Sequence, residues 1–205
     1  MAWNRYHIVS RWRVRGTPEE VYEVLDDPAE LPRWWPAVYL DVKEMERGDP
    51  RGIGRSFRLL TKGWLPYRLN WTLRTLEKER PRRILIEATG DFTGRGTWTI
   101  TPDGPWVDAV FDWDVCAEKR LLRWFSFLLR PAFAANYRWA MARGRESLEL
   151  ELARRLAPTP EARAKVAPPP GPTTVSSLTL LLGLAGTGVV LGAAVFAMVK
   201  LLGSG

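Results

Sequence analysis

The chain has 205 residues, of which 46% are hydrophobic and eleven are Trp, a composition that excludes a disordered protein and suits one ordinary domain with a buried core. Its formal net charge of +7 favours anionic partners. The sequence contains no run of five or more basic residues, so a nucleic-acid-binding arm is not predicted. A single Cys and a single His exclude a disulfide within the chain and disfavour a zinc cluster. We therefore expect no nucleic-acid partner, no metal and no cofactor.

The first elements in chain order are a strand and a capped helix. Residues 7–15 alternate apolar and polar side chains, which predicts a strand. Thr17 can cap a helix, and Glu20, three residues later, completes a capping box. We expect this helix to end at Asp27-Pro28, and a short second helix to end at residues 34–36. The first seven residues contain no apolar run, so no secretory signal peptide is expected.

The middle of the chain predicts the rest of a sheet. Most of its strand-like segments have one apolar and one polar face, which is typical of an antiparallel sheet with one face in water. Gly94 and Gly96 lie on the apolar face, where we expect them to leave room for a hollow. The predicted strands are residues 38–47, 56–61, 67–78, 83–89, 92–101 and 106–118.

The last element of the domain is a long helix. After Pro131, apolar residues recur at three- and four-residue steps over about 24 residues. A curved antiparallel sheet of about six to seven strands, wrapped on this helix, buries every apolar face at once. The predicted class is therefore α+β, with one domain over residues 1–157.

The C-terminal part predicts a membrane anchor. Residues 158–174 are rich in Pro, which disfavours a helix and predicts an extended linker. No residue from 178 to 199 is charged, and about 20 apolar residues suffice to cross a bilayer, so we predict a transmembrane helix over residues 175–202. Basic residues before the span predict a single-pass, tail-anchored protein with its domain in the cytoplasm. Gly188 and Gly192 form a GxxxG pattern, which suits a homodimer but also occurs by chance.

Several stretches, taken in their order along the chain, resemble a known superfamily. They are the first helix from Thr17 to Leu25, the Trp34-Trp35-Pro36 helix end, Ala88-Thr89-Gly90-Asp91 with Gly94-Arg95-Gly96-Thr97-Trp98, and the closing helix over residues 136–141 and 147–152. Together they resemble the START-like (SRPBCC) superfamily, and within it the polyketide cyclase/dehydrase-type group, over most of residues 6–156. The resemblance implies a helix-grip fold with a cavity between sheet and helix, which takes lipids, sterols, polyketides, quinones or other apolar molecules. It carries over no catalytic residues.

Candidate ligand-binding residues are the inward-facing apolar side chains of the sheet and of the closing helix. The same residues also suit an ordinary packed core, so both interpretations stay open. Tyr137 can donate a hydrogen bond to a ligand, whereas His7, Asp112 and Asp114 are expected to face water. No catalytic residue is predicted. The cavity-lining candidates are Trp35, Tyr67, Leu69, Trp71, Leu73, Trp98, Phe111, Trp113, Phe133, Tyr137 and Met141.

The sequence leaves three functions open. The first is membrane-tethered binding of a hydrophobic small molecule or lipid in the cavity between sheet and C-terminal helix. The second is a polyketide cyclase/dehydrase-like enzyme, which needs an acid/base pair or a nucleophile in that cavity. The third is a membrane-anchored protein-interaction module. Residues 119–130 combine aromatic, aliphatic and basic side chains, which suits either contact with lipid or a buried connector.

Overall fold

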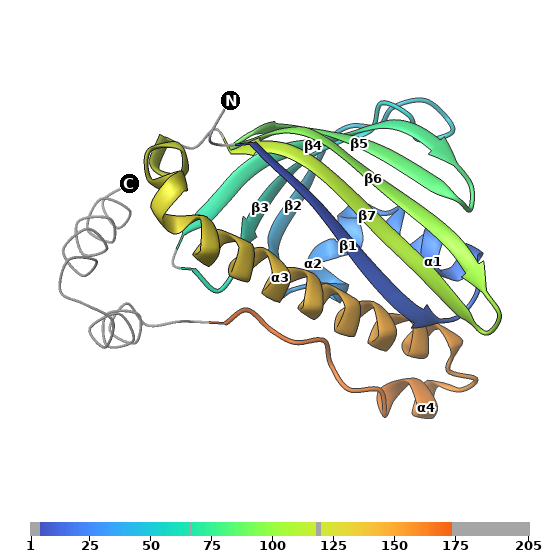
Figure 1. Ribbon diagram of the computed structural model, residues 1–205. Coiled ribbons are helices and arrows are strands. Elements are labelled where there is room, and N and C mark those ends of the chain that lie inside the picture. Colours follow the sequence, from blue (N-terminus) through green and yellow to red (C-terminus); the bar gives the residue numbers. More distant parts are fainter. Residues whose placement is uncertain (1–4, 66, 118–119, 174–205) are drawn as a thin grey trace, which may run out of the picture.

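The computed structural model describes residues 5–65, 67–117 and 120–173 (Figure 1). One sheet of seven antiparallel strands, in the order β1-β7-β6-β5-β4-β3-β2, curves around a long helix, α3. This arrangement confirms the predicted α+β class and the predicted strand number. The elements are β1 Arg5–Arg15, α1 Pro18–Leu25, the 3-10 turn η1 Pro28–Glu30, α2 Leu31–Trp34, β2 Tyr39–Glu46, β3 Ser56–Lys62, β4 Arg68–Glu79, β5 Arg83–Gly90, β6 Phe92–Asp103, β7 Trp106–Ala117, α3 Arg120–Leu156 and α4 Pro160–Ala164.

The helix that follows β1 begins as predicted. The Glu20 N–H donates to the Thr17 hydroxyl at 3.3 Å, and the Thr17 N–H donates to the Glu20 carboxylate at 2.8 Å. This reciprocal capping box satisfies donors that the first helical turn leaves open. Helix α1 ends at Leu25, and its C-cap residue, Asp26, donates its N–H to the carbonyl of Tyr22. Helices α1 and α2 lie inside the curve of the sheet (Figure 1).

Strand β4 contains an irregularity that the alternating pattern does not predict. Its pairing with β5 slips between Thr75 and Glu77, so Thr75 lies opposite Ile86 but Lys78 lies opposite Ile84. Cross-strand partners share a face of the sheet. Since the side chains of Ile84 and Ile86 are both buried, the bulge turns Lys78 to the concave face, where strict alternation from Thr75 would place Glu77.

Helix α3 is longer than predicted. It begins at Arg120 and continues through Pro131, so a start after Pro131 was wrong. Proline usually breaks or kinks a helix because it lacks an N–H donor and its ring crowds the preceding turn. Here the chain stays helical across that position, and the side chains of residues 117–131 lie outside the described part of the structure.

The C-terminal half of α3 packs against α2 through a buried carboxylate. Glu151 is 2% exposed and accepts two hydrogen bonds from Arg33 of α2, at 2.7 and 2.8 Å. Arg154 and Arg155 donate to the same carboxylate from one turn further along α3, at 3.2 and 2.7 Å. Burial alone would raise the pKa of Glu151, but the hydrogen bonds from Arg33 and Arg155 outweigh it and lower the pKa to about 2.

The Pro-rich segment after α3 is not a simple extended linker. Pro160 occupies the first turn of α4, with Thr159 as its cap, so the expectation of no helix there was wrong; Pro is tolerated at this position because the first N–H has no partner within the helix. Arg154 donates to the carbonyl of Ala167 at 2.9 Å, and the segment runs back beneath α3 in the view of Figure 1.

The predicted transmembrane helix over residues 175–202, with its uncharged stretch 178–199, lies outside the described residues, as does the Gly188/Gly192 pattern. Within residues 5–65, 67–117 and 120–173, no helix has the length and apolar character to cross a bilayer. The membrane anchor and the homodimer therefore stay predictions.

Candidate functional site: an aromatic-walled cavity

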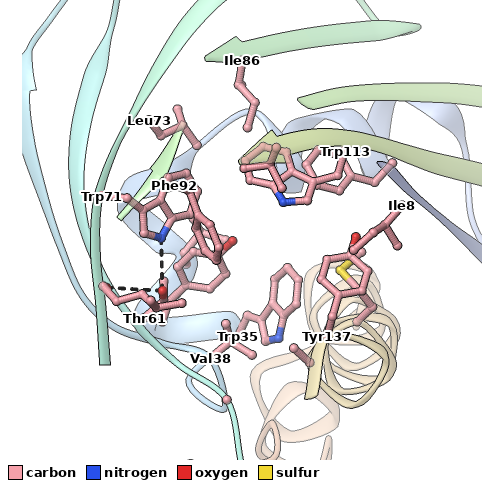
Figure 2. Close-up of a pocket in the computed structure, with 18 of the residues that line it drawn as sticks. Ile8, Trp35, Val38, Thr61, Trp71, Leu73, Ile86, Phe92, Trp113 and Tyr137 are labelled. Atoms are coloured by element: carbon pink, nitrogen blue, oxygen red, sulfur yellow. Dashed lines mark hydrogen bonds between the residues drawn. The ribbon is translucent and has the colours of Figure 1, made fainter. Parts of the chain in front are cut away.

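A cavity of about 210 Å³ lies between the concave face of the sheet and the N-terminal half of α3. Its wall includes side chains from β1, α2 and β3 to β7 (Figure 2). Helix α3 closes it with Phe133, Ala134, Asn136, Tyr137, Ala140 and Met141. Period-two alternation in the strands and the helical repeat in α3 direct these side chains inward, so the hollow is built from the same pattern that builds the core.

The structure brings together all the candidate residues from the sequence. The strand candidates come from the inward face of β4, β6 and β7 and from the turn before β4, and Trp35 follows α2. Whether they bind a ligand is a prediction that the structure alone does not test. The candidates that line the cavity are Trp35, Tyr67, Leu69, Trp71, Leu73, Trp98, Phe111, Trp113, Phe133, Tyr137 and Met141.

Stacked rings form one side of the wall. Phe111 stacks on Trp98 with ring centroids 4.7 Å apart and on Trp113 at 5.3 Å. Gly96 makes this possible, since a Cβ there would lie 2.6 Å from both rings, Phe111 Cζ and Trp113 Cε3. The expectation that this glycine leaves a hollow was therefore wrong: two rings occupy the room. Gly94 instead lies tight against the backbone of β7, at Asp114 and Val115.

Trp71, on the opposite side of the wall, is held by a hydrogen bond. Its indole N–H donates to the Thr61 hydroxyl at 3.1 Å, and that hydroxyl donates to the carbonyl of Leu69 at 3.4 Å (Figure 2). Because its polar atom is satisfied locally, the indole presents only apolar surface to the cavity. Its ring centroid lies 6.0 Å from that of Trp113 and 6.1 Å from that of Phe92, so the aromatic lining continues from β4 to β7.

Phenol groups supply polar atoms to the wall. The Ser10 hydroxyl of β1 donates to the Tyr137 hydroxyl at 3.1 Å. Burial raises the pKa of Tyr137 to about 12, with Ser10 opposing and Asp112 adding to the rise. Burial also raises the pKa of Tyr39 and Tyr67. These phenols stay protonated at neutral pH, so they act as hydrogen-bond donors and not as bases.

The acidic residues of β7 point away from the cavity, as predicted. Asp114 pairs with Arg5 at 2.6 Å, and Asp112 contacts Nε2 of His7 at 2.9 Å, all on the exposed face of the sheet. Among the described residues, no group of three or more His, Cys, Asp or Glu side chains is arranged to hold a metal ion.

One family model matches residues 6–149, and its description is polyketide cyclase / dehydrase and lipid transport. The chain belongs to this family. The match confirms the resemblance to the polyketide cyclase/dehydrase-type group, and its description names both cyclase/dehydrase and lipid-transport activities. No curated protein matches the chain.

Solved structures share the fold of this polyketide cyclase/dehydrase family member at low identity. A Thermus thermophilus protein matches with a TM-score of 0.58 at 16% identity, over 74% of this chain and 99% of that one. The Zhui aromatase/cyclase of a Streptomyces species has a TM-score of 0.58 at 17% identity, over 74% and 96%. The di-domain ARO/CYC protein StfQ of the steffimycin biosynthetic pathway has a TM-score of 0.54 at 16% identity, over 73% and 52%. At these identities the likeness shows the fold alone.

Sequence reasoning missed several polar residues in the wall of this family member. Asp26, Thr61, Lys62, Thr75 and Asn136 all line the cavity. The Asn136 carbonyl oxygen accepts from the Leu65 N–H at 3.2 Å and so ties α3 to the β3–β4 turn. Thr75 follows the alternation of β4 and could have been found from that pattern, whereas Asp26 is a helix C-cap and carries no such signal.

Proposed function

We propose that this protein binds an uncharged hydrophobic small molecule or lipid in the cavity between the sheet and α3. The observation that carries the proposal is the cavity itself, about 210 Å³ of space behind a mainly aromatic and aliphatic wall. A cavity of this kind is costly in an ordinary core, because interiors pack to nearly crystalline density and voids destabilise. Transfer of apolar ligand surface from water into such a site contributes about 25 cal/mol per Å² before the costs of binding.

The proposal includes a membrane tether. The uncharged residues 178–199 are long enough to cross a bilayer, and the basic residues before them favour the cytoplasmic side for the domain. The tether would place the cavity close to the phase in which apolar ligands concentrate. This part of the proposal is supported by the sequence pattern, and protease protection of the domain in sealed membrane vesicles tests it.

Binding is tested by filling the cavity from α3. Ala140 lines the cavity, whereas Ala142 on the same helix is exposed, so Ala140→Phe and Ala142→Phe form a matched pair. The full chain in phosphatidylcholine nanodiscs is titrated with naphthalene derivatives by calorimetry, and titrations into empty nanodiscs are subtracted. We expect Ala140→Phe to weaken binding at least tenfold and Ala142→Phe to leave it unchanged. Absence of saturable binding to the wild-type chain, or equal binding by both variants, overturns the proposal.

A cyclase/dehydrase-like enzyme is the second candidate, and the family description supports it. The surroundings of Tyr137 argue against an enzyme that uses this residue as a base. Its hydroxyl contacts the neutral Ser10, and its pKa is raised. The two functions differ in their response to Tyr137→Phe, because removal of a proton donor abolishes turnover in an enzyme but leaves most of the affinity of a binding protein.

A further inference from the structure

A charged pair, Asp26 and Lys78, lies beside the cavity at the point where α1 ends. Asp26, the C-cap residue of α1, lines the cavity, and the ammonium group of Lys78 lies 2.7 Å from its Oδ1. Lys78 reaches this position only because the β4 bulge turns it to the concave face. Two features that local sequence patterns do not reveal, a helix end and a bulge, therefore bring these side chains together.

Lys78 is enclosed on its other sides. Its side chain is 10% exposed, and its Nζ would be only 2.6 Å from a Cβ placed on Gly52 in the β2–β3 turn. That turn is bonded to the bulge itself, through Gly54 N–H to Thr75 O at 2.8 Å and Thr75 N–H to Arg55 O at 2.9 Å. A buried ammonium needs a counter-ion, and Asp26 supplies it.

Asp26 has acceptor capacity that the protein does not use. An ionised carboxylate has about four acceptor positions on its two oxygens. Oδ1 is buried and has Lys78 as its neighbour, but no described residue donates to it in good hydrogen-bond geometry. Oδ2 accepts no hydrogen bond from the described residues either. The Asp26 side chain is 27% exposed, so its remaining acceptor positions are open to a partner supplied from outside the chain.

We propose that Asp26, held by Lys78, anchors a neutral hydrogen-bond donor, such as a hydroxyl group, on an otherwise apolar ligand. This inference rests on the proposed function and specifies the ligand: one polar donor near α1, with an apolar body against the aromatic wall. A donor fits the site because a carboxylate can only accept. A neutral donor fits better than an ammonium group because Lys78 already balances the charge of Asp26, and a second cation there would be repelled.

Thr75 supports this placement. It lines the cavity, is 4% exposed and precedes Lys78 on the same strand by three residues. Its hydroxyl can accept as well as donate, so it suits a hydroxyl that donates to Asp26. Ile84 and Ile86 of β5, which lie opposite Lys78 and Thr75, add aliphatic surface at this end, and Trp98 of the aromatic wall lies opposite Ile84.

Three naphthalene probes test the inference on the full chain in nanodiscs. 2-Naphthol carries a donor, 2-methoxynaphthalene has the same ring without a donor, and 2-(aminomethyl)naphthalene carries an ammonium group. We expect 2-naphthol to bind at least tenfold more tightly than the methyl ether, which corresponds to about 1.4 kcal/mol. The ammonium probe should bind more weakly than 2-naphthol.

The deciding variant removes the pair as a unit. Asp26→Leu with Lys78→Met replaces both charges by apolar side chains, and such replacements of buried pairs often preserve stability. We expect this double variant to bind both neutral probes with equal affinity. The control is Glu23→Gln with Arg80→Gln, which removes an exposed ion pair of α1 and should keep the tenfold preference.

The outcomes separate the two proposals. If none of the probes binds the wild-type chain, the proposed function fails and this inference fails with it. If 2-naphthol and its methyl ether bind equally to the wild-type chain, or if the preference survives in the double variant, Asp26 is not the anchor although the cavity binds ligands. Tighter binding of the ammonium probe than of 2-naphthol also overturns the inference. The single variant Asp26→Asn, which keeps one acceptor oxygen, should retain part of the preference.

Discussion

The two halves of α3 pack against the sheet in different ways. In the C-terminal half, Ser147, Leu148, Glu151 and Leu152 are each at most 2% exposed, so this half is packed as a solid core. In the N-terminal half, residues 133–137 are only partly buried, and all of them except Ala135 border the cavity. The difference arises because α1 and α2 fill the space beneath one end of the helix and not beneath the other.

We therefore expect the two halves of α3 to differ in what their residues determine: stability in the C-terminal half and ligand binding in the N-terminal half. Substitutions in the C-terminal half should cost stability, and substitutions in the N-terminal half should change ligand binding at little cost to the fold.

The largest effect is expected at Glu151. Glu151→Gln removes the charge that three arginines share, so we expect a loss of about 3–5 kcal/mol in the free energy of unfolding, measured by urea denaturation. Glu146→Gln, which removes an exposed partner of Arg143 on the same helix, should change it by less than about 1 kcal/mol. Equal losses of stability for the two variants would contradict the conclusion that the buried Glu151 carboxylate contributes more to stability than an exposed ion pair.

The same carboxylate predicts a pH dependence. The pKa of Glu151 is lowered to about 2 in the folded protein, and an ordinary Glu in the unfolded chain titrates near 4.5. The stabilisation is therefore complete above pH 4.5 and is lost as the pH falls from there toward 2. Urea denaturation across this range should show a steeper loss of stability for the wild-type chain than for Glu151→Gln; parallel curves would count against it.

A pair of core substitutions compares the two halves directly. Leu148→Ala should cost about 2–5 kcal/mol because it leaves a void in a filled core. Phe133→Ala should cost about 1 kcal/mol, because Phe133 is partly buried and borders a space that is already open. Phe133→Ala should nevertheless weaken probe binding. A larger loss of stability for Phe133→Ala than for Leu148→Ala would refute the distinction between the halves.

A smaller effect is expected at Gly144, between the two halves. A Cβ there would lie 2.7 Å from Trp12 Cζ2 and 2.6 Å from Trp35 Cε2, and both rings are buried. Alanine gains about 1 kcal/mol of helix propensity over glycine, but overpacking costs about 1–3 kcal/mol, so Gly144→Ala should be neutral to about 2 kcal/mol destabilising. Ala142→Gly, on the exposed side of the same helix, measures the difference in helix propensity alone. A stabilised Gly144→Ala variant would show that the two rings can move.

The smallest effect concerns Ser10 and Tyr137. Ser10→Ala and Tyr137→Phe each remove one side of the hydroxyl contact, and a double-mutant cycle should give a coupling of about 0.5–1 kcal/mol. Additive losses in urea denaturation would mean that the two hydroxyls do not stabilise each other.

Local patterns predicted most of the fold and the cavity wall. The capping box at Thr17 and the alternation of β4, β6 and β7 depend only on neighbours in sequence, so the inward aromatic residues were identifiable without coordinates. The filling of the space above Gly96 was not identifiable, because two residues of the paired strand, Phe111 and Trp113, fill it.

The features that escaped prediction depend on contacts distant in sequence. The inward turn of Lys78 requires the β4 bulge, which is set by the pairing with β5 and by the β2–β3 turn. The continuation of α3 through Pro131 and the docking of the Pro-rich segment contradict local preferences, and no sequence pattern signals the contact from Arg154 to Ala167.

The attachment of residues 157–167 to α3 has a mechanical consequence. If residues 157–173 were fully extended at about 3.1 Å per residue, they would form a linker roughly 50 Å long. Because Arg154 is hydrogen-bonded to Ala167 and α4 is folded between them, most of that length is not free to extend. A force applied to the C-terminal end would thus act on α3 directly, and α3 is the helix that closes the cavity.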